Sequence, residues 1–361
     1  MINICFAFNH LQYSDGVARA AVAMANALAE TENVQVTLRP IFFMEKNVSE
    51  FVSNKVIVKP LFGFYFHGLS KVLSLIPDRI LHNLIFESNK YDIEIGFQHG
   101  TATRAVTSDR NKNKRHLVWI HGYDDKLEMK KYYIKADTVV CVSKSNAKRL
   151  SKDIKELKKR QIDYCYNPID DFIVESMGNE KSDLNESKNI RFITVGRLSP
   201  EKGYMRLLKV LLKLKNEGYL FQMIFVGDGP QRSELETFVK QHSMEEFVSF
   251  KGTQSNPHKF TSKCDIFICS SYSEGYSTSS TEAIMLGIPV ISTLVSGAEE
   301  IIGDADCGLV VDNNDKSLYL GLKKVLDDPT LIPRWKSILK RTKYNFSKET
   351  RIGRLKKILE I

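Results

Sequence analysis

The chain has 361 residues and a mass of 41.2 kDa, which is about the size of two globular domains. Its composition, 43% hydrophobic and 26% charged, excludes a disordered or collagen-like protein. No apolar run approaches the roughly 18–20 residues that cross a bilayer, and the first residues, Met1–Phe8, lack the basic segment of a secretory signal. We therefore expect a soluble, cytoplasmic protein.

The charge is unevenly distributed along the chain. Lys and Arg number 52 against 43 Asp and Glu, and residues 1–170 hold 25 of the basic and 18 of the acidic residues. A positive first half attracts phosphates of nucleic acids, anionic membranes or phosphorylated substrates, although solvated helix faces account for it equally well. The basic runs lack interleaved aromatic residues and any nucleic-acid-binding module, so we expect no nucleic-acid partner.

Six cysteines stand at positions 5, 141, 165, 264, 269 and 307, and none of them forms a CxxC pair. In a long chain without a secretory signal, this irregular spacing favours buried thiols over disulfides. The spacing also fits no cysteine-based zinc site.

Buried strands alternate with helices along the first half. An Ala-rich helix is predicted over 17–30, and apolar strands are predicted at 2–10, 34–43, 91–97, 116–122, 137–143 and 163–168. Residues 171–189 are polar and aperiodic, which indicates a linker. The alternation predicts a first, Rossmann-like domain over 1–170 with a parallel sheet.

The second half repeats this alternation. Helices are predicted at 204–218 and 233–243, and strands at 190–196, 221–229, 248–252, 264–270, 288–293 and 307–311. A second doubly wound domain therefore covers 190–344, and a last helix, about 345–361, is expected to pack back on the first domain. Folds of this class bind ligands at the carboxyl ends of their strands, and two such domains facing each other form a cleft.

Residues 195–203 (VGRLSPEKG) carry the first chemical signal. A strand ends at Gly196, the loop presents Arg197 and Lys202, and Gly203 leads into a helix. A guanidinium and an ammonium beside a helix N-terminus suit a diphosphate.

Residues 274–282 (EGYSTSSTE) carry the second signal, because Glu274 and Glu282 can each accept two hydrogen bonds from a vicinal diol of a ribose or hexose. Together the two segments describe a binding site for a sugar nucleotide. Either segment alone is more often an ordinary ion pair or a capped helix.

The two segments in this order resemble the nucleotide-sugar-binding domain of the GT-B, family 4 retaining glycosyltransferases, also called glycosyl transferases group 1. Glu274 and Glu282 match the E-x7-E signature of that family, and residues 196–203 match its G-R-x-x-x-x-K-G loop. Further matches lie at 227–230, 287–290 and 296–300. The resemblance is dense over 190–312 and much weaker over 1–170.

The resemblance implies a role for each matching position. Arg197 and Lys202 are expected to hold the donor diphosphate and to stabilise the charge that grows as the sugar leaves. Glu274 is expected at the transferred sugar and Glu282 at the ribose. His121, in WIHG at a strand end, is expected at the sugar as well. The expected catalytic residues are Arg197, Lys202, Glu274 and His121, and the expected donor-binding residues are Gly16, Gly196, Arg197, Lys202, Glu274, Tyr276, Ser277, Thr278 and Glu282.

The sequence departs from the family pattern at two places. The first loop has one glycine, Gly16, where a pair is common, and the hydroxyl-rich run 277–281 replaces the usual residues after Glu274 and Gly275. The sugar is therefore not readable, and a UDP-sugar is favoured over GDP-mannose. We expect no metal and no cofactor, because Asp304-Ala-Asp306 is interpreted as a turn rather than a D-x-D metal motif.

The acceptor is indicated only by residues 59–86, which are aromatic, apolar and lightly basic. This segment is interpreted either as a surface that meets an anionic membrane or a polyprenyl-linked glycan, or as a pair of core helices. The favoured function is transfer of a hexose to a glycan or lipid-linked glycan of lipopolysaccharide, capsule or exopolysaccharide, at the inner face of the cell membrane. The alternatives are a nucleotide-sugar 2-epimerase or a sugar phosphorylase of the same fold, and a non-catalytic sugar-nucleotide-binding partner.

Overall fold

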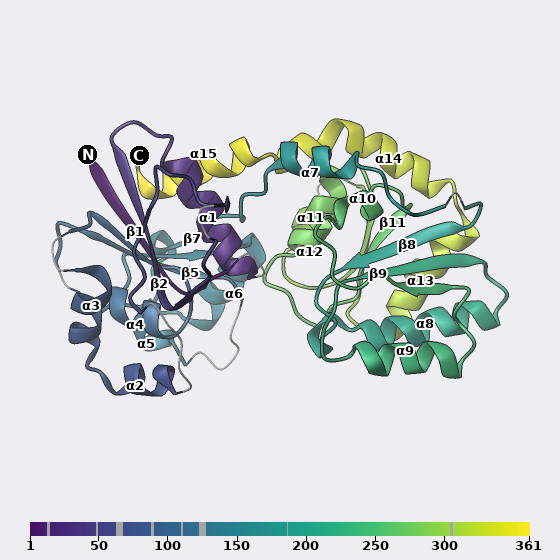
Figure 1. Ribbon diagram of the computed structural model, residues 1–361, viewed down its shortest axis with the longest axis horizontal. Helices are drawn as coiled ribbons and strands as arrows, with labels where there is room; N and C mark the ends of the chain where they lie inside the picture. The colour runs from purple at the N-terminus through teal and green to yellow at the C-terminus, as the bar shows by residue number, and fades with distance from the viewer. Residues whose placement is uncertain are drawn as a thin grey trace. The chain divides into compact units, whose positions relative to one another are not determined.

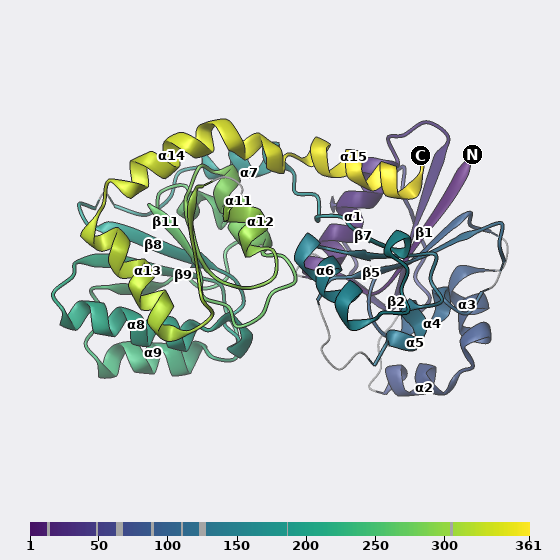
Figure 2. The same ribbon diagram turned by 180° about the vertical axis from the view of Figure 1, so that it is seen from behind.

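The computed structural model describes residues 1–12, 15–47, 50–62, 68–87, 90–109, 111–122, 128–185, 187–303 and 306–361 (Figures 1 and 2). The chain divides into two compact units. The first comprises Met1–Pro168 together with Lys348–Ile361, and the second comprises Ile169–Ser347.

A parallel sheet forms the centre of the first unit. Within the described residues it has seven strands in the order β3-β2-β1-β4-β5-β6-β7. These strands are β1 Ile2–Leu11, β2 Val34–Met44, β3 Ile57–Val58, β4 Ile93–Gly96, β5 Arg115–Ile120, β6 Thr138–Cys141 and β7 Ile162–Tyr164. Their runs of buried Val, Ile and Phe are typical of parallel strands that are covered on both faces.

Helices connect the strands of the first unit. Asp15 caps the first of them, since its Oδ1 accepts from the Val17 amide at 2.8 Å. The last helix, α15, returns to this unit and contacts α1. The helices are α1 Gly16–Leu28, α2 Leu69–Leu75, α3 Asp78–Phe86, α4 Thr101–Val106, α5 Lys130–Tyr133, α6 Lys144–Asp153 and α15 Lys348–Leu359, with a short 3-10 helix at Lys159–Gln161.

The second unit repeats the architecture. Its described residues form a six-stranded parallel sheet in the order β10-β9-β8-β11-β12-β13. The strands are β8 Ile190–Val195, β9 Phe221–Val226, β10 Val248–Phe250, β11 Ile266–Cys269, β12 Val290–Thr293 and β13 Gly308–Val311.

Helices cover both faces of this second sheet (Figures 1 and 2). One face is sealed by an apolar core that joins the sheet to α8, α9, α13 and α14 and includes Trp335. The helices are α7 Asp171–Gly178, α8 Tyr204–Asn216, α9 Arg232–Gln241, α10 His258–Thr261, α11 Thr278–Met285, α12 Ala298–Ile302, α13 Asp315–Asp327 and α14 Leu331–Thr342, with 3-10 helices at Pro200–Lys202 and Lys343–Phe346.

The α/β class with two doubly wound sheets is confirmed, and every predicted strand overlaps an observed one. The linker prediction is wrong for its first part: residues 171–178 form α7, because Asp170 caps a helix whose Val174 is buried. Helices α13 and α14 lie in a stretch for which the sequence analysis predicts no helix. All six cysteines are buried and free, as predicted.

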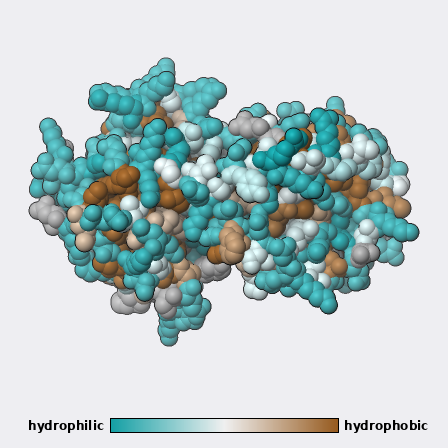
Figure 3. All heavy atoms as spheres, turned by 90° about the horizontal axis from the view of Figure 1, so that it is seen from above, coloured by the Kyte–Doolittle hydropathy of each residue, from teal (hydrophilic) through white to brown (hydrophobic). Residues whose placement is uncertain are grey.

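The visible surface is mainly hydrophilic, as the proportion of charged residues in the sequence leads one to expect. Figure 3 shows hydrophilic residues over most of one face, with hydrophobic residues in small groups between them. In the part of the chain that the structure describes, no helix combines the length and apolar character needed to cross a bilayer.

Candidate functional site

The two motif segments of the second unit lie at the same edge of its sheet. Strands β8 and β11 are neighbours and run parallel, so the loops that follow their carboxyl ends emerge side by side. The first loop, residues 196–203, follows β8, and the second, residues 270–277, follows β11. The sheet thus places together two segments that are separated in the sequence by the 66 residues 204–269.

Direct contacts join the two loops. Ser270 Oγ donates to the Lys202 carbonyl at 2.9 Å, and the Tyr272 amide donates to the Glu201 carbonyl at 2.8 Å. Gly203 has φ +65°, and a Cβ at this position would lie 2.2 Å from the Ser270 carbonyl oxygen. Only glycine permits both this left-handed conformation and this close approach.

Lys202 and Glu274 form the charged centre of the site. Lys202 Nζ donates to Glu274 Oε1 at 2.8 Å, and Ser271 Oγ donates to the same oxygen at 2.6 Å. The two charged side chains are 25% and 12% exposed. Burial by itself lowers the pKa of Lys202, but the Glu274 carboxylate outweighs it and raises the pKa, so Lys202 keeps its positive charge at neutral pH.

The buried side chain of Arg206 stabilises the second loop, residues 270–277, through hydrogen bonds to its backbone. Arg206 lies in α8, and its guanidinium donates to the Ser270 carbonyl at 2.8 and 2.5 Å and to the Ser271 carbonyl at 2.7 Å. The guanidinium also donates to Asn313 Oδ1 at 2.8 Å. Its central carbon, Cζ, lies 3.9 Å from the ring centroid of Tyr272. Arg206 therefore fixes the backbone just before Glu274.

A third loop, GDGP at 227–230, packs against the first. The Leu198 amide donates to the Asp228 carbonyl at 2.9 Å, and the Gly227 backbone has φ +131°. A Cβ on Gly227 would lie 2.0 Å from the Gly196 carbonyl oxygen, so a larger residue would displace the loop that carries Arg197. The Arg197 side chain itself is exposed, and its guanidinium has no hydrogen bond or ion pair with any residue that the structure describes.

The remaining predicted residues of this unit lie in or just before α11. Ser277 is its N-cap, with Oγ 3.3 Å from the Ser280 amide, and Thr278 is its first residue. Tyr276 is buried, and its ring packs against Gly297. A Cβ on Gly297 would lie 2.6 Å from Cδ2 of this ring. Glu282 is half-buried within the same helix. The positive end of the helix thus directly follows the Glu274 loop.

His121 and Gly16 belong to the first unit. His121 directly follows β5, and its ring meets Phe97 edge-on at 4.6 Å. Its buried Nε2 has no hydrogen-bond partner in the described part of the chain. Burial, together with the nearby His99, lowers the pKa of His121 to about 3, so the ring is neutral at physiological pH. A Cβ on Gly16 would meet nothing within 4 Å, so packing within this unit does not require glycine there.

The structure thus brings Lys202 and Glu274 into contact and places Gly196 and Arg197 on the same loop as Lys202. Sequence reasoning missed Arg206 and Ser271, which hold Glu274 in place. The sequence does contain a signal for Arg206, because this charged residue shares one face of its helix with the apolar Val210 and Leu214. Asp304, in the D-x-D interpreted as a turn, lies outside the described residues.

Comparisons with known proteins agree with this geometry. Residues 178–343 match the family model described as "Glycosyl transferases group 1". One relative, 30% identical over 60% of this chain and 58% of its own length, is an N-acetylgalactosamine-N,N'-diacetylbacillosaminyl-diphospho-undecaprenol 4-alpha-N-acetylgalactosaminyltransferase from Campylobacter jejuni. Another, 27% identical over 56% of this chain and 57% of its own length, is the lipopolysaccharide core biosynthesis glycosyltransferase LpsD from Rhizobium meliloti.

A solved structure shares the whole fold. The Anabaena protein HepE, crystallised in complex with UDP, superposes with a TM-score of 0.76 at 15% identity, over 100% of both chains. The present chain spans less than two thirds of the length of the two curated relatives named above.

Proposed function

We propose that this chain, which has the GT-B fold and whose residues 178–343 belong to the glycosyl transferases group 1 family, transfers a hexose from a nucleotide-diphosphate sugar to a glycan or lipid-linked glycan. The observation that carries the proposal is the Lys202–Glu274 pair at the junction of two loops, 2.8 Å apart and buttressed by Arg206. This partly buried ion pair joins residues 72 positions apart, and it places an ammonium beside a carboxylate, the groups that a diphosphate and a sugar hydroxyl would bind.

The chemistry follows from the charges of the site. Arg197 and Lys202 bind the donor diphosphate, and they stabilise the negative charge that develops on it as the glycosidic bond breaks. Glu274 accepts from Lys202 and Ser271 through Oε1, and its Oε2 accepts from hydroxyls of the transferred sugar. Glu282 binds the ribose. In this proposal Arg197 and Lys202 supply the positive charge that a metal would otherwise provide, and the reaction needs no metal at the diphosphate.

The residues proposed from the first unit are His121 and Gly16. The neutral His121 ring offers Nε2, which has no hydrogen-bond partner among the described residues, to a sugar hydroxyl. The role of Gly16 in donor binding rests on the family resemblance, and a Cβ there would meet nothing within 4 Å in its own unit. Retention of the anomeric configuration rests on the family 4 resemblance, and a uridine nucleotide is the favoured donor.

The relatives support an acceptor from cell-surface polysaccharide synthesis. The Campylobacter relative is named for a diphospho-undecaprenol substrate, and the Rhizobium relative for the lipopolysaccharide core. We propose that the present chain extends a polyprenyl-linked or lipid-linked glycan. We propose that the protein meets this acceptor at the inner face of the membrane.

Helices α2 and α3 supply the membrane-facing surface in this proposal. Leu73 and Leu81 are buried, so one side of each helix belongs to the core, whereas Leu75 and Ile80 on the outer side are 85% and 53% exposed. Lys71 and Arg79 are exposed on the same two helices, and Arg79 adds charge next to Ile80. An apolar and basic surface fits anionic lipid.

A flotation assay tests the membrane contact. The wild type should float with anionic liposomes at low salt. Leu75→Glu should bind at least tenfold less, because a leucine that moves from water into lipid contributes about 1.5–3 kcal/mol. Leu320→Glu, at a half-exposed leucine of α13, is the matched control. A wild type that stays at the bottom of the gradient contradicts this part of the proposal.

A thermal-shift screen with UDP-, GDP- and ADP-sugars tests the donor site. A ligand at 100 times its Kd stabilises the folded state by about 2.7 kcal/mol, so the correct donor should stand out. Lys202→Met and Glu282→Gln should lose the shift, while Lys209→Met and Glu245→Gln, at exposed positions of the same unit, should keep it. Equal shifts in all five proteins would remove the site assignment.

Incubation of the donor without an acceptor separates transfer from the alternative reactions of this fold. A transferase gives slow hydrolysis or no change, whereas an epimerase returns an epimerised sugar nucleotide. With a polyprenyl-linked acceptor, the anomeric configuration of the product reports retention directly. Activity that persists in excess EDTA supports a metal-independent diphosphate site.

A further inference from the structure

A second cluster of polar side chains lies in the first unit, apart from the proposed donor residues. It comprises His82 of α3, Glu94 of β4, Asp109 after α4 and His116 of β5. Glu94 and His116 are register partners near the amino ends of adjacent parallel strands. Ligands of doubly wound sheets bind at the carboxyl ends, so this cluster lies at the opposite edge from the substrate side.

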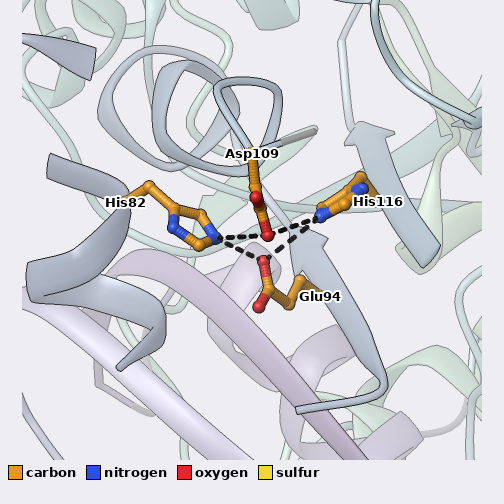
Figure 4. A group of neighbouring side chains, drawn as sticks. All are labelled: His82, Glu94, Asp109 and His116. Carbon is orange, nitrogen blue, oxygen red and sulfur yellow. Dashed lines mark hydrogen bonds and ion pairs between the residues drawn. The ribbon is translucent and has the colours of Figure 1, made fainter. Parts of the chain in front are cut away.

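The four side chains point at one another (Figure 4). His82 Nε2 lies 2.6 Å from Glu94 Oε2 and 3.7 Å from Asp109 Oδ2. His116 Nε2 lies 3.6 and 3.4 Å from the same two oxygens. One atom from each residue therefore contributes to a group whose members all lie within 4.8 Å of one another.

These separations match a tetrahedral metal site. Bonds of about 2.0–2.2 Å from Zn²⁺ to nitrogen and oxygen place neighbouring ligand atoms about 3.3–3.5 Å apart. Three of the four measured nitrogen–oxygen distances, 3.4, 3.6 and 3.7 Å, lie close to that value. The shorter one is the hydrogen bond between His82 and Glu94, which opens by less than 1 Å when a metal replaces its proton.

The surroundings also resemble those of a metal centre. Glu94 is fully buried, and its other oxygen, Oε1, accepts from Lys114 Nζ at 2.7 Å. The other nitrogen of His116, Nδ1, faces Asp137 Oδ2 at 3.5 Å. A ligating carboxylate that is hydrogen-bonded, and a ligating imidazole whose second nitrogen meets a carboxylate, are typical of the outer shell of zinc sites.

Two carboxylates accompany the two imidazoles in this cluster. Lys114 Nζ lies 2.7 Å from Oε1 of the fully buried Glu94 and 3.7 Å from Asp109 Oδ2. We propose that His82, Glu94, Asp109 and His116 bind one Zn²⁺ ion that stabilises the first unit and takes no part in glycosyl transfer. Two imidazoles with two carboxylates favour zinc over Ca²⁺ or Mg²⁺, which prefer oxygen ligands.

The competing explanation is a cluster held by a proton instead of a metal. Burial by itself lowers the pKa of His82, but the hydrogen bond and the charge of Glu94, together with Asn83 and Asp109, outweigh burial and raise the pKa. A protonated His82 then supplies the second cation and excludes Zn²⁺. The two explanations differ in whether the wild-type protein binds metal at all.

The test uses the untagged full chain, stripped with a chelator and then titrated with Zn²⁺ and with Co²⁺. We expect one equivalent to bind, a rise in the melting temperature, and the visible absorption of tetrahedral Co²⁺. His82→Gln and His116→Gln should weaken Zn²⁺ binding at least tenfold, whereas His258→Gln in the second unit should match the wild type. Donor binding should persist in all of them.

Two results overturn the proposal: a wild type that binds no Zn²⁺ at micromolar free metal, or variants that bind it as the wild type does. The wild-type stoichiometry and Co²⁺ spectrum do not depend on the variants, so they decide the matter even if a histidine substitution prevents folding. Loss of donor binding with intact Zn²⁺ binding would count against the proposed function and not against this site.

Discussion

Replacing Gly203 by alanine tests the packing of the two loops on which the donor site depends. The new Cβ would lie 2.2 Å from the Ser270 carbonyl oxygen and 2.8 Å from Arg206 Nε. Because the first of these atoms belongs to the backbone, one loop has to move. We expect the Lys202–Glu274 contact, which joins the same two loops, to be lost with it.

The magnitude has two parts. Alanine at φ +65° costs about 1–2 kcal/mol for the left-handed conformation, and the overlap adds roughly 1–3 kcal/mol. Gly218→Ala is the matched control, because Gly218 has φ +90° but a Cβ there meets nothing within 4 Å. Gly218→Ala should lose only the free energy that the left-handed conformation costs. The difference in stability between the two variants therefore isolates the cost of the steric overlap.

The measurement is urea unfolding followed by Trp335, which lies in the core of the second unit, in a Trp119→Phe background that removes the other tryptophan. Donor binding is then titrated with a UDP-sugar. We expect Gly203→Ala to be less stable than Gly218→Ala and to bind donor at least tenfold more weakly. Equal stability and equal binding in the two variants would refute the proposed contact between the loops.

Three further predictions follow from the same structure. Lys202→Met should lower kcat about 10²–10³-fold with little loss of stability, as measured by initial rates and urea unfolding, because it removes a charge that the departing diphosphate needs. Arg206→Met should lower the free energy of unfolding by about 2–4 kcal/mol and weaken donor binding, because it leaves loop carbonyls without a donor; unchanged binding would contradict its positioning role. His121 has a pKa of about 3 in the folded protein, below the roughly 6.5 of the unfolded chain. The neutral ring's contribution to the free energy of unfolding is therefore fully present above pH 6.5 and is lost as the pH falls towards 3. Wild type should lose about 2 kcal/mol more than His121→Phe between pH 7 and pH 5 in urea titrations, and parallel pH profiles would show that the ring is protonated in the folded state.

Local signals in the sequence were sufficient to predict the strands of both sheets. Apolar runs of four to seven residues are buried wherever they occur in a parallel sheet, so the strand at 266–269 and its neighbours follow from periodicity and β-branching. The failures have equally local causes. Residues 171–178 look polar and aperiodic, yet Asp170 caps a short helix that buries a single valine against its unit.

The amino-acid sequence by itself predicted two α/β units, which the structure confirms, and it singled out Lys202 and Glu274 as candidate residues for binding a sugar nucleotide. Only the tertiary structure decided that these two touch, because the order of strands in a sheet is set by packing between segments and not by any one of them. The same reason explains why Arg206 and the cluster of His82, Glu94, Asp109 and His116 escaped sequence reasoning. Their members lie 7 to 15 residues apart with no regular spacing, and only the pairing of β4 with β5 and the fold of the helices around them bring the four side chains together.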